Sequence, residues 1–67
     1  MAVARVSEVT ASSTVSWQDA VNEALSRANK TLRGITGLEV TSQKAKVIDG
    51  KISEYRITVK ITFILEG

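Results

Sequence analysis

The sequence of 67 residues contains no cysteine, no histidine and no proline. The lack of cysteine excludes disulfides, thiolate metal sites and cysteine nucleophiles. The lack of histidine removes the most common metal ligand and the most common general base. No convincing pair of nucleophile and base remains in the chain, so we expect that the protein is not an enzyme.

Long apolar runs are also missing from the chain. No stretch approaches the ~20 apolar residues that cross a bilayer, and the N-terminus lacks the charged-then-apolar pattern of a signal peptide. We therefore expect no membrane partner and a cytoplasmic location. The net charge of +2 is too small to indicate a nucleic-acid partner by itself, although the isoelectric point is about 9.3.

Only four glycines interrupt the chain, which favours regular structure over linkers or disorder. We interpret residues 1–67 as a single domain. A chain of this size buries only about 60% of the surface that its unfolded form exposes. Small proteins compensate with disulfides, a metal or oligomerisation, and here oligomerisation is the leading candidate.

The chain does contain a long alternation of apolar and polar residues near its C-terminus. Since side chains alternate across a strand, this pattern predicts one extended strand over residues 51–65, on the order of 40 Å long. We place Ile61 and Phe63 in the core. The apolar side of the predicted strand carries Tyr55, Ile57, Val59, Ile61, Phe63 and Leu65.

A helix is predicted over residues 17–33, because apolar residues recur there at helical spacing. Ser16 is the predicted N-cap, and Gly34 is the predicted left-handed residue after the last turn. A helix of about 25 Å covers only part of a 40 Å strand, so we expect another copy of the chain to cover the rest. The apolar stripe consists of Trp17, Ala20, Val21, Ala24, Leu25, Ala28 and Leu32.

The remaining segments complete an α+β domain. Residues 2–11 are interpreted as a first strand, residues 12–14 as a loop and residues 35–48 as a second strand. Asp49-Gly50 predicts a hairpin turn in which both residues have positive φ. The predicted order is β-α-β-β, with the helix lying on one face of a three-stranded antiparallel sheet.

This order of elements, the chain length and several local strings resemble the dodecin family. The resemblance implies a sheet wrapped around one helix and the assembly of twelve copies into a hollow homododecamer. It further implies a flavin ligand (FMN, FAD or riboflavin), bound as stacked pairs at subunit contacts for storage and not for turnover. The segments that carry the resemblance are residues 5–13, 20–28, 30–33, 38–40, 49–51 and 55–66.

Two positions depart from the pattern of flavin-binding dodecins. The resemblance places a flavin-stacking Trp two residues before a Glu-Val pair, where this sequence has Gly37. It also places a flavin-contacting Gln after the strand tyrosine, where Arg56 follows Tyr55. Both changes predict weak or absent flavin binding, because an aromatic contact is lost and Arg cannot accept a hydrogen bond.

Three functions stay open on the sequence alone. One is a small-ligand-binding or storage dodecamer with an altered flavin site at Gly37, Tyr55 and Arg56. Another is a structural dodecameric shell without flavin, stabilised by a divalent cation whose ligands the sequence does not locate. The remote alternative is a nucleic-acid-binding module, which is disfavoured because the polar strand face has no aromatic residue among its basic ones.

Several individual residues have two interpretations. Trp17 is interpreted mainly as a cover for the apolar stripe, with flavin stacking as the alternative. Arg56, Thr58 and Lys60 either bind anions or form a solvated face or the lining of the oligomer. Lys44 and Lys46 share one side of the second strand and are consistent with a solvated edge.

Overall fold

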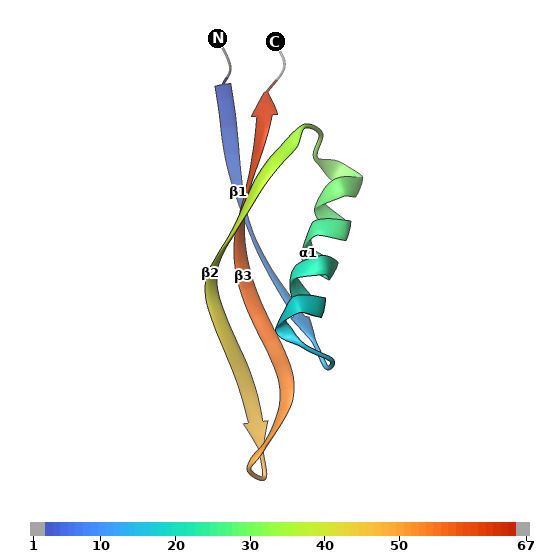
Figure 1. Cartoon of the computed structure of the whole chain (residues 1–67), viewed down its shortest axis with the longest axis vertical. Helices are drawn as coiled ribbons and strands as arrows, with labels where there is room; N and C mark the ends of the chain where they lie inside the picture. Colours follow the sequence, from blue (N-terminus) through green and yellow to red (C-terminus); the bar gives the residue numbers. More distant parts are fainter. Residues whose placement is uncertain (1–2, 66–67) are drawn as a thin grey trace.

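The computed structural model describes residues 3–65. Strand β1 (Val3–Ser13) is followed by helix α1 (Trp17–Thr31), strand β2 (Ile35–Ile48) and strand β3 (Lys51–Leu65) (Figure 1). This order confirms the predicted β-α-β-β arrangement, and the predicted bounds of the second and third strands agree with β2 and β3. The predicted start of the first strand at Ala2 lies outside the described residues.

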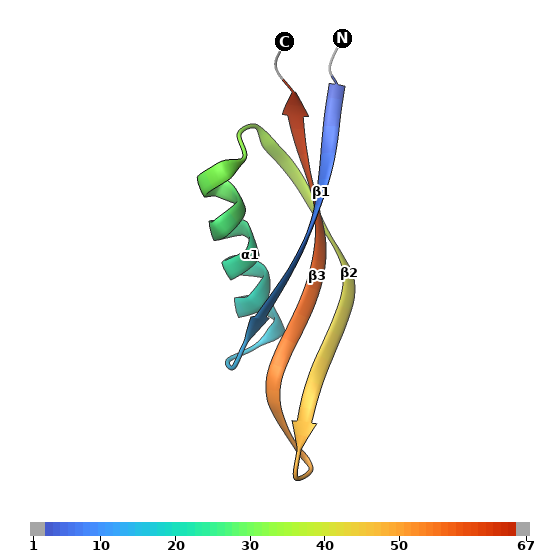
Figure 2. The ribbon, with the colours of Figure 1, turned by 180° about the vertical axis from the view of Figure 1, so that it is seen from behind.

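The three strands form one antiparallel sheet in the order β1-β3-β2. The strand with the strongest alternation, β3, is therefore the central one and pairs along both edges. The helix lies along one side of the sheet, as the two opposite views show (Figures 1 and 2). We call the side of the sheet that α1 covers the helix face and the opposite side the outer face.

Extra residues at three points shift the pairing of β2 with β3, between Ile35 and Gly37, between Val40 and Ser42, and between Lys46 and Val47. Such bulges move the following side chains to the other face of the strand. At the last shift the extra residue is Ser53 of β3, whose hydroxyl donates to the carbonyl of Lys46 across 3.3 Å. The faces on which the polar residues of β2 lie therefore depend on these bulges.

The core lies between the helix and the helix face of β3. Ala20, Ala24 and Ala28 are buried on the helix, and their small side chains let it lie close to the sheet. Each fully buried Ile or Val contributes roughly 1.5–3 kcal/mol relative to an exposed one. The buried residues of β3 are Ile57, Val59 and Ile61.

The start of the helix agrees with the prediction. Ser16 is the N-cap, and its hydroxyl accepts a 2.9 Å hydrogen bond from the Asp19 backbone N–H. The predicted loop over residues 12–14 is wrong at Ser12 and Ser13, since both pair with β3. The backbone of Ser13 belongs to the strand, while its side chain stabilises the connection to the helix. Its hydroxyl donates to the Asp19 carboxylate and accepts from the Val15 backbone N–H.

The end of the helix differs from the predicted residue 33. The last helical residue is Thr31, and Leu32 is extended, with φ −108° and ψ 144°. Leu32 is the C-cap, and its side chain packs against the core from this position. Gly34 is left-handed as predicted, with φ +71°, but it follows an extended segment and does not close the last helical turn.

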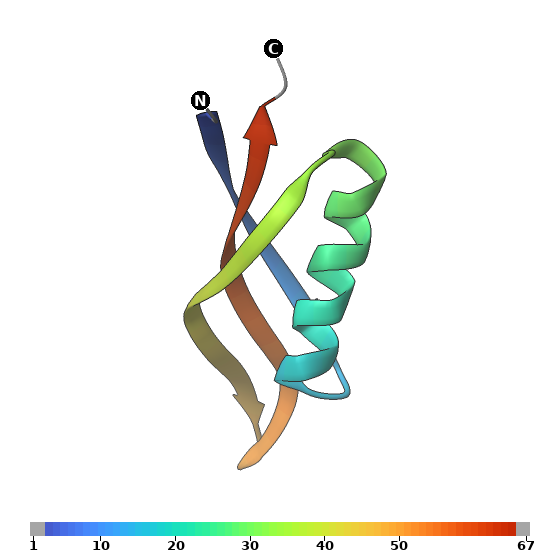
Figure 3. The ribbon, with the colours of Figure 1, turned by 45° about the horizontal axis from the view of Figure 1, so that its top comes forward.

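The sheet is much longer than the helix that covers it. The molecule extends 52 Å along its long axis, whereas a helix of 15 residues spans about 22 Å. The β2–β3 hairpin projects beyond the helix, as the tilted view also shows (Figure 3). Its turn has the predicted geometry, with φ +52° at Asp49 and +75° at Gly50.

Apolar side chains are exposed where the helix does not reach. Val47 is 60% exposed at one end of the sheet, and Leu65 is 44% exposed at the other. Phe63 is only half-buried in one chain, so its predicted core position is wrong for the protomer, because α1 ends before it. No helix within residues 3–65 is long and apolar enough to span a membrane.

Candidate ligand-binding surface

The three residues predicted to form a ligand site do not meet within one chain. Gly37 pairs with Thr62, whereas Arg56 pairs with Lys44, and both lie on the outer face of the sheet. Six positions of β3 separate Thr62 from Arg56, which corresponds to about 20 Å. Tyr55 lies on the helix face beside Ala45. A site that contains all three would need residues from more than one copy of the chain.

Tyr55 contacts the only tryptophan of the chain. The ring centroids of Trp17 and Tyr55 are 4.9 Å apart, with planes at 77°, which is a T-shaped contact. The indole N–H of Trp17 donates to the backbone carbonyl of Lys44 across 2.9 Å. Trp17 also packs against the buried core, in agreement with its main interpretation as a cover for the apolar stripe.

Gly37 lies in β2 directly after the first shift in its pairing with β3, and it leaves open space on the outer face. A Cβ atom built there would have the Thr62 Cβ, at 4.0 Å, as its near neighbour. The backbone of Gly37 does not have positive φ, in contrast to Gly34 and Gly50. A larger side chain therefore fits at this position without backbone strain.

Arg56 is held by a neighbouring carboxylate on the outer face. Its Nη2 donates to Glu54 Oε1 across 3.3 Å. Hydrogen bonds from the Ser12 hydroxyl and from Arg56 hold the pKa of the Glu54 carboxyl below its usual value of 4.5. Glu54 therefore stays ionised at neutral pH and orients the guanidinium along the strand.

Two lysines of β2 lie beside this pair. Lys44 is the register partner of Arg56, and Lys46 is the register partner of Glu54. The four side chains surround a shallow hollow of about 340 Å³, with Ala45 at its wall. We call these four residues the outer-face patch.

The sequence analysis considered Lys44, Lys46 and Arg56 but did not bring them together. If the pairing next to the two-residue turn, Ile48 with Lys51, continued without a bulge, Lys44 would pair with Tyr55 on the helix face. The extra residue Ser53 moves the pairing by one and places Lys44 opposite Arg56. A serine near a hairpin turn was the only local signal, and it is too common to predict a bulge.

Lys60 has different surroundings from Arg56. Its register partners are Glu8 on β1 and Glu39 on β2, so one cation lies between two carboxylates in the same row. Of the residues considered for anion binding, Lys60 is therefore disfavoured by its neighbours. On the outer face of β3, Thr58 lies between Arg56 and Lys60, and its hydroxyl is 3.1 Å from that of Thr10.

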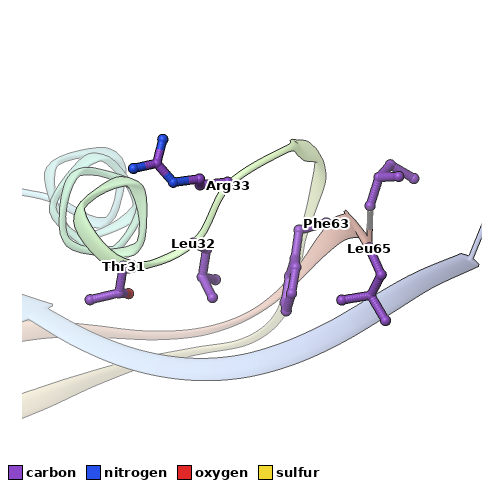
Figure 4. Close-up of a pocket in the computed structure, with 6 residues that line it drawn as sticks. Thr31, Leu32, Arg33, Phe63 and Leu65 are labelled. Carbon is purple, nitrogen blue, oxygen red and sulfur yellow. The ribbon is translucent and has the colours of Figure 1, made fainter. Parts of the chain in front are cut away.

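A second hollow, of about 280 Å³, lies where the helix ends against β3. Leu32 and Phe63 extend into this space, whereas the guanidinium of Arg33 points away from Leu32 (Figure 4). Its lining is mainly apolar and includes the exposed Leu65. Within residues 3–65 no three Asp or Glu side chains gather into a group that could hold a metal ion.

Comparison with known proteins identifies the family. A family model described as Dodecin matches residues 3–66. The chain belongs to the dodecin family. Assembly into dodecamers and flavin binding are characteristic of this family. The predicted fold, a β-α-β-β sheet with one helix, is confirmed, and the predicted homododecamer matches the family. A search of curated proteins found no match.

Solved dodecin structures superimpose closely on this chain. A point variant of the dodecin from Thermus thermophilus has a TM-score of 0.94 and 28% identity, and the match covers 100% of both chains. The dodecin from Streptomyces coelicolor has a TM-score of 0.92 and 33% identity over 98% of this chain and 94% of that one. A structure described as a calcium dodecin from Mycobacterium tuberculosis has a TM-score of 0.81 and 32% identity, covering 96% and 91%.

Proposed function

We propose that this dodecin is a non-enzymatic, homododecameric small-ligand-binding protein that binds flavin weakly. The observation that supports this most directly is the pair of replacements at Gly37 and Arg56, both on the outer face of the sheet. The first removes a ring that would stack on the flavin, and the second exchanges a neutral donor and acceptor for a cation. Family membership supports ligand binding, and the two replacements argue against tight flavin binding.

The loss at Gly37 is substantial in energetic terms. An aromatic contact contributes about 0.5–1.5 kcal/mol beyond the area that it buries. The open space above Gly37 means that no other side chain of the same protomer takes the place of the missing ring. Losing both the contact and its buried area weakens binding by about tenfold or more.

The replacement at Arg56 acts in the same direction. The Arg56 guanidinium is bound to Glu54, and it has no acceptor atom with which to meet a ring N–H. A flavin ring placed against this position would have to displace Glu54 or leave the cation without its partner. Either event costs binding energy that a neutral Gln would not require.

Riboflavin titration tests the proposal directly. We expect weak quenching of riboflavin fluorescence by the wild-type protein at micromolar concentrations, and at least tenfold tighter binding by the double variant Gly37→Trp/Arg56→Gln. Val15→Trp is the matched control, because it adds the same ring at an exposed residue outside the outer-face patch. Native mass spectrometry of each variant verifies the dodecamer.

Two outcomes would contradict this proposal. Submicromolar riboflavin binding by the wild-type protein would show that the replacements do not weaken the site. No gain in the double variant would show that its surroundings, and not two missing contacts, prevent binding.

The calcium dodecin from Mycobacterium tuberculosis supports a second candidate, a shell stabilised by a divalent cation. Since residues 3–65 of one chain gather no metal-binding group, such a site would need carboxylates from several copies. Chelation by EDTA should then lower the thermal midpoint, and added calcium should restore it. An unchanged midpoint and a metal-free native mass would exclude this candidate.

A further inference from the structure

We infer that Asp49, at the tip of the β2–β3 hairpin, is a site of spontaneous isomerisation to isoaspartate in the folded protein. In isoaspartate the peptide bond to the next residue runs through the side-chain carboxyl carbon instead of the main-chain carbonyl carbon. The inference is independent of the proposed ligand binding, because it uses no residue of the outer-face patch and no predicted flavin position.

The reaction needs only water and the two residues of the turn. The Gly50 nitrogen loses its proton and bonds to the side-chain carbonyl carbon of the protonated Asp49 carboxyl group, whose hydroxyl leaves. One water is thereby released and a five-membered imide ring forms. Water then adds to the main-chain carbonyl carbon in that ring and breaks its bond to the Gly50 nitrogen. The chain stays linked through the Asp49 side chain, and the former main-chain carbonyl becomes a free carboxylate.

Both reacting groups of the turn are exposed. Asp49 and Gly50 lie at the end of the hairpin that projects beyond α1 (Figure 1). Among residues 3–65, the side-chain hydrogen bonds and ion pairs do not include the Asp49 carboxylate, and the backbone hydrogen bonds of turns and caps do not include the Gly50 N–H. A Cβ atom built on Gly50 would meet nothing within 4 Å beyond its chain neighbours, so the protomer leaves room for the ring.

The other aspartate of the chain, Asp19, shows how a fold restrains both groups. Its carboxylate accepts a 2.6 Å hydrogen bond from the Ser13 hydroxyl. The nitrogen that would attack it belongs to Ala20, whose N–H donates to the Ser16 carbonyl across 3.1 Å. The first turn of α1 therefore holds the carboxylate and the nitrogen on separate partners. Asp49 has neither restraint, so the two aspartates form an internal comparison within one chain.

The backbone of the turn also favours the reaction. Asp49 has φ +52°, a conformation that residues with a side chain rarely adopt. Gly50 has no side chain to shield its nitrogen from attack on the carboxyl group. The side chains next to the turn, including Val47, Ile48 and Ile52, are exposed and lie outside the core. Local opening of this end costs little free energy because few buried contacts are lost, so ring closure does not require unfolding of the core.

The product does not fit the two-residue turn. Isoaspartate adds its Cβ atom to the main chain, so the connection between the register partners Ile48 and Lys51 becomes one atom longer. The tight turn that matches the twist of the two strands is then disturbed. Hydrogen exchange of the amides of residues 47–52 should rise in the modified protein, whereas exchange at the buried residues Ile57, Val59 and Ile61 should stay the same.

Ageing of the intact, assembled protein tests the inference. The protein is incubated at neutral pH and physiological temperature and then digested. Peptide mass spectrometry locates isoaspartate, and an isoaspartate-specific methyltransferase with labelled S-adenosylmethionine quantifies it. We expect the isoaspartate formed at Asp49 to exceed that formed at Asp19 by about tenfold or more, because only Asp49 can bring its reacting groups together. In a denaturant that unfolds the chain, Asp19 loses its restraints and the ratio should fall.

Two variants separate the reaction from other changes on ageing. Asp49→Glu should remove most of the methyl incorporation, because the longer side chain would have to close a six-membered ring. Asp49→Asn should react faster through the same imide, with loss of ammonia in place of water, and Asn-Gly suits the same turn. Circular dichroism and native mass spectrometry before ageing verify the fold and copy number of both variants.

Three results would overturn the inference. Isoaspartate at residue 49 in the denatured chain but not in the folded protein would show that the folded turn prevents ring closure. Equal amounts at Asp19 and Asp49 in the folded protein would show that the restraints on Asp19 are irrelevant. Undiminished methyl incorporation by aged Asp49→Glu would place the reactive residue elsewhere in the chain.

Discussion

The indole N–H of Trp17 donates to the backbone carbonyl of Lys44 across 2.9 Å, which joins the first turn of α1 to the middle of β2. This bond lies at the row of the sheet where β1 ends, since Lys44 and Ser12 both pair with Arg56. The same ring contacts Tyr55 edge-on. Trp17 thus connects the helix with the projecting hairpin, whose outer side carries the charged patch.

Replacing Trp17 by Phe should lower the free energy of unfolding by about 1–2 kcal/mol, because one hydrogen bond and part of the packed ring are lost. Denaturant unfolding followed by circular dichroism at equal protomer concentration measures the change. Val15→Ala, at a residue that is 70% exposed, should change stability by less than about 0.5 kcal/mol. Equal stability of Trp17→Phe and wild type would show that the bond to Lys44 contributes nothing.

Replacing Ile61 by Asp should abolish folding and assembly together. Ile61 is 0% exposed at the centre of the core, and an unpaired carboxylate there costs more than a small protomer has in reserve. Native mass spectrometry and circular dichroism report on assembly and folding. Lys60→Gln, at the neighbouring outer-face position, should remain folded. A soluble, folded monomer of Ile61→Asp would contradict the assignment of the two faces.

Replacing each of the two glycines after the helix by alanine should change the stability of the protein in different ways. Gly34→Ala should destabilise the protein by about 1–2 kcal/mol, because φ is +71° and the new Cβ would lie 3.2 Å from the Ile64 carbonyl oxygen. Gly37→Ala should be neutral or stabilising by up to about 1 kcal/mol, since its backbone is ordinary strand and its surroundings are open. Thermal unfolding of the two variants in parallel provides the comparison, and equal losses would refute it.

The ionised form of Glu54 should contribute to stability above pH 4.5. Its pKa is lowered in the folded state by the Ser12 hydroxyl and by Arg56, so the contribution is present above the usual value of 4.5. It is lost as the pH falls through the lowered pKa. Glu54→Gln should therefore flatten the acid side of a stability-against-pH curve, and Ser12→Ala should flatten it less. Superimposable acid limbs for wild type and Glu54→Gln would exclude this contribution.

Local rules were sufficient where a single residue type determines the backbone. Asp49-Gly50 predicted the hairpin turn, and Ser16 predicted the start of the helix, because positive φ and an N-cap hydroxyl are properties of those residues. The same rules failed at Ser12 and Ser13. Their small polar side chains are typical of loops, yet their backbones complete the pairing with β3.

The candidate site could be predicted only in part. Resemblance to a family indicated Gly37, Tyr55 and Arg56, but not that Tyr55 lies on the opposite face from the other two. The grouping of Lys44 and Lys46 with Arg56 was not predicted. It results from the register between β2 and β3, which cannot be read from the residues of either strand alone.

Residue patterns alone were enough to predict the order of the elements, the turn of the hairpin and the apolar side of β3, because these depend on local conformation and on an uninterrupted alternation. The register of β2, in contrast, is established by its pairing with β3 in the folded chain. Its polar middle has no strong preference for either face, so one extra residue at Ser53 was enough to place Lys44 beside Arg56 instead of Tyr55.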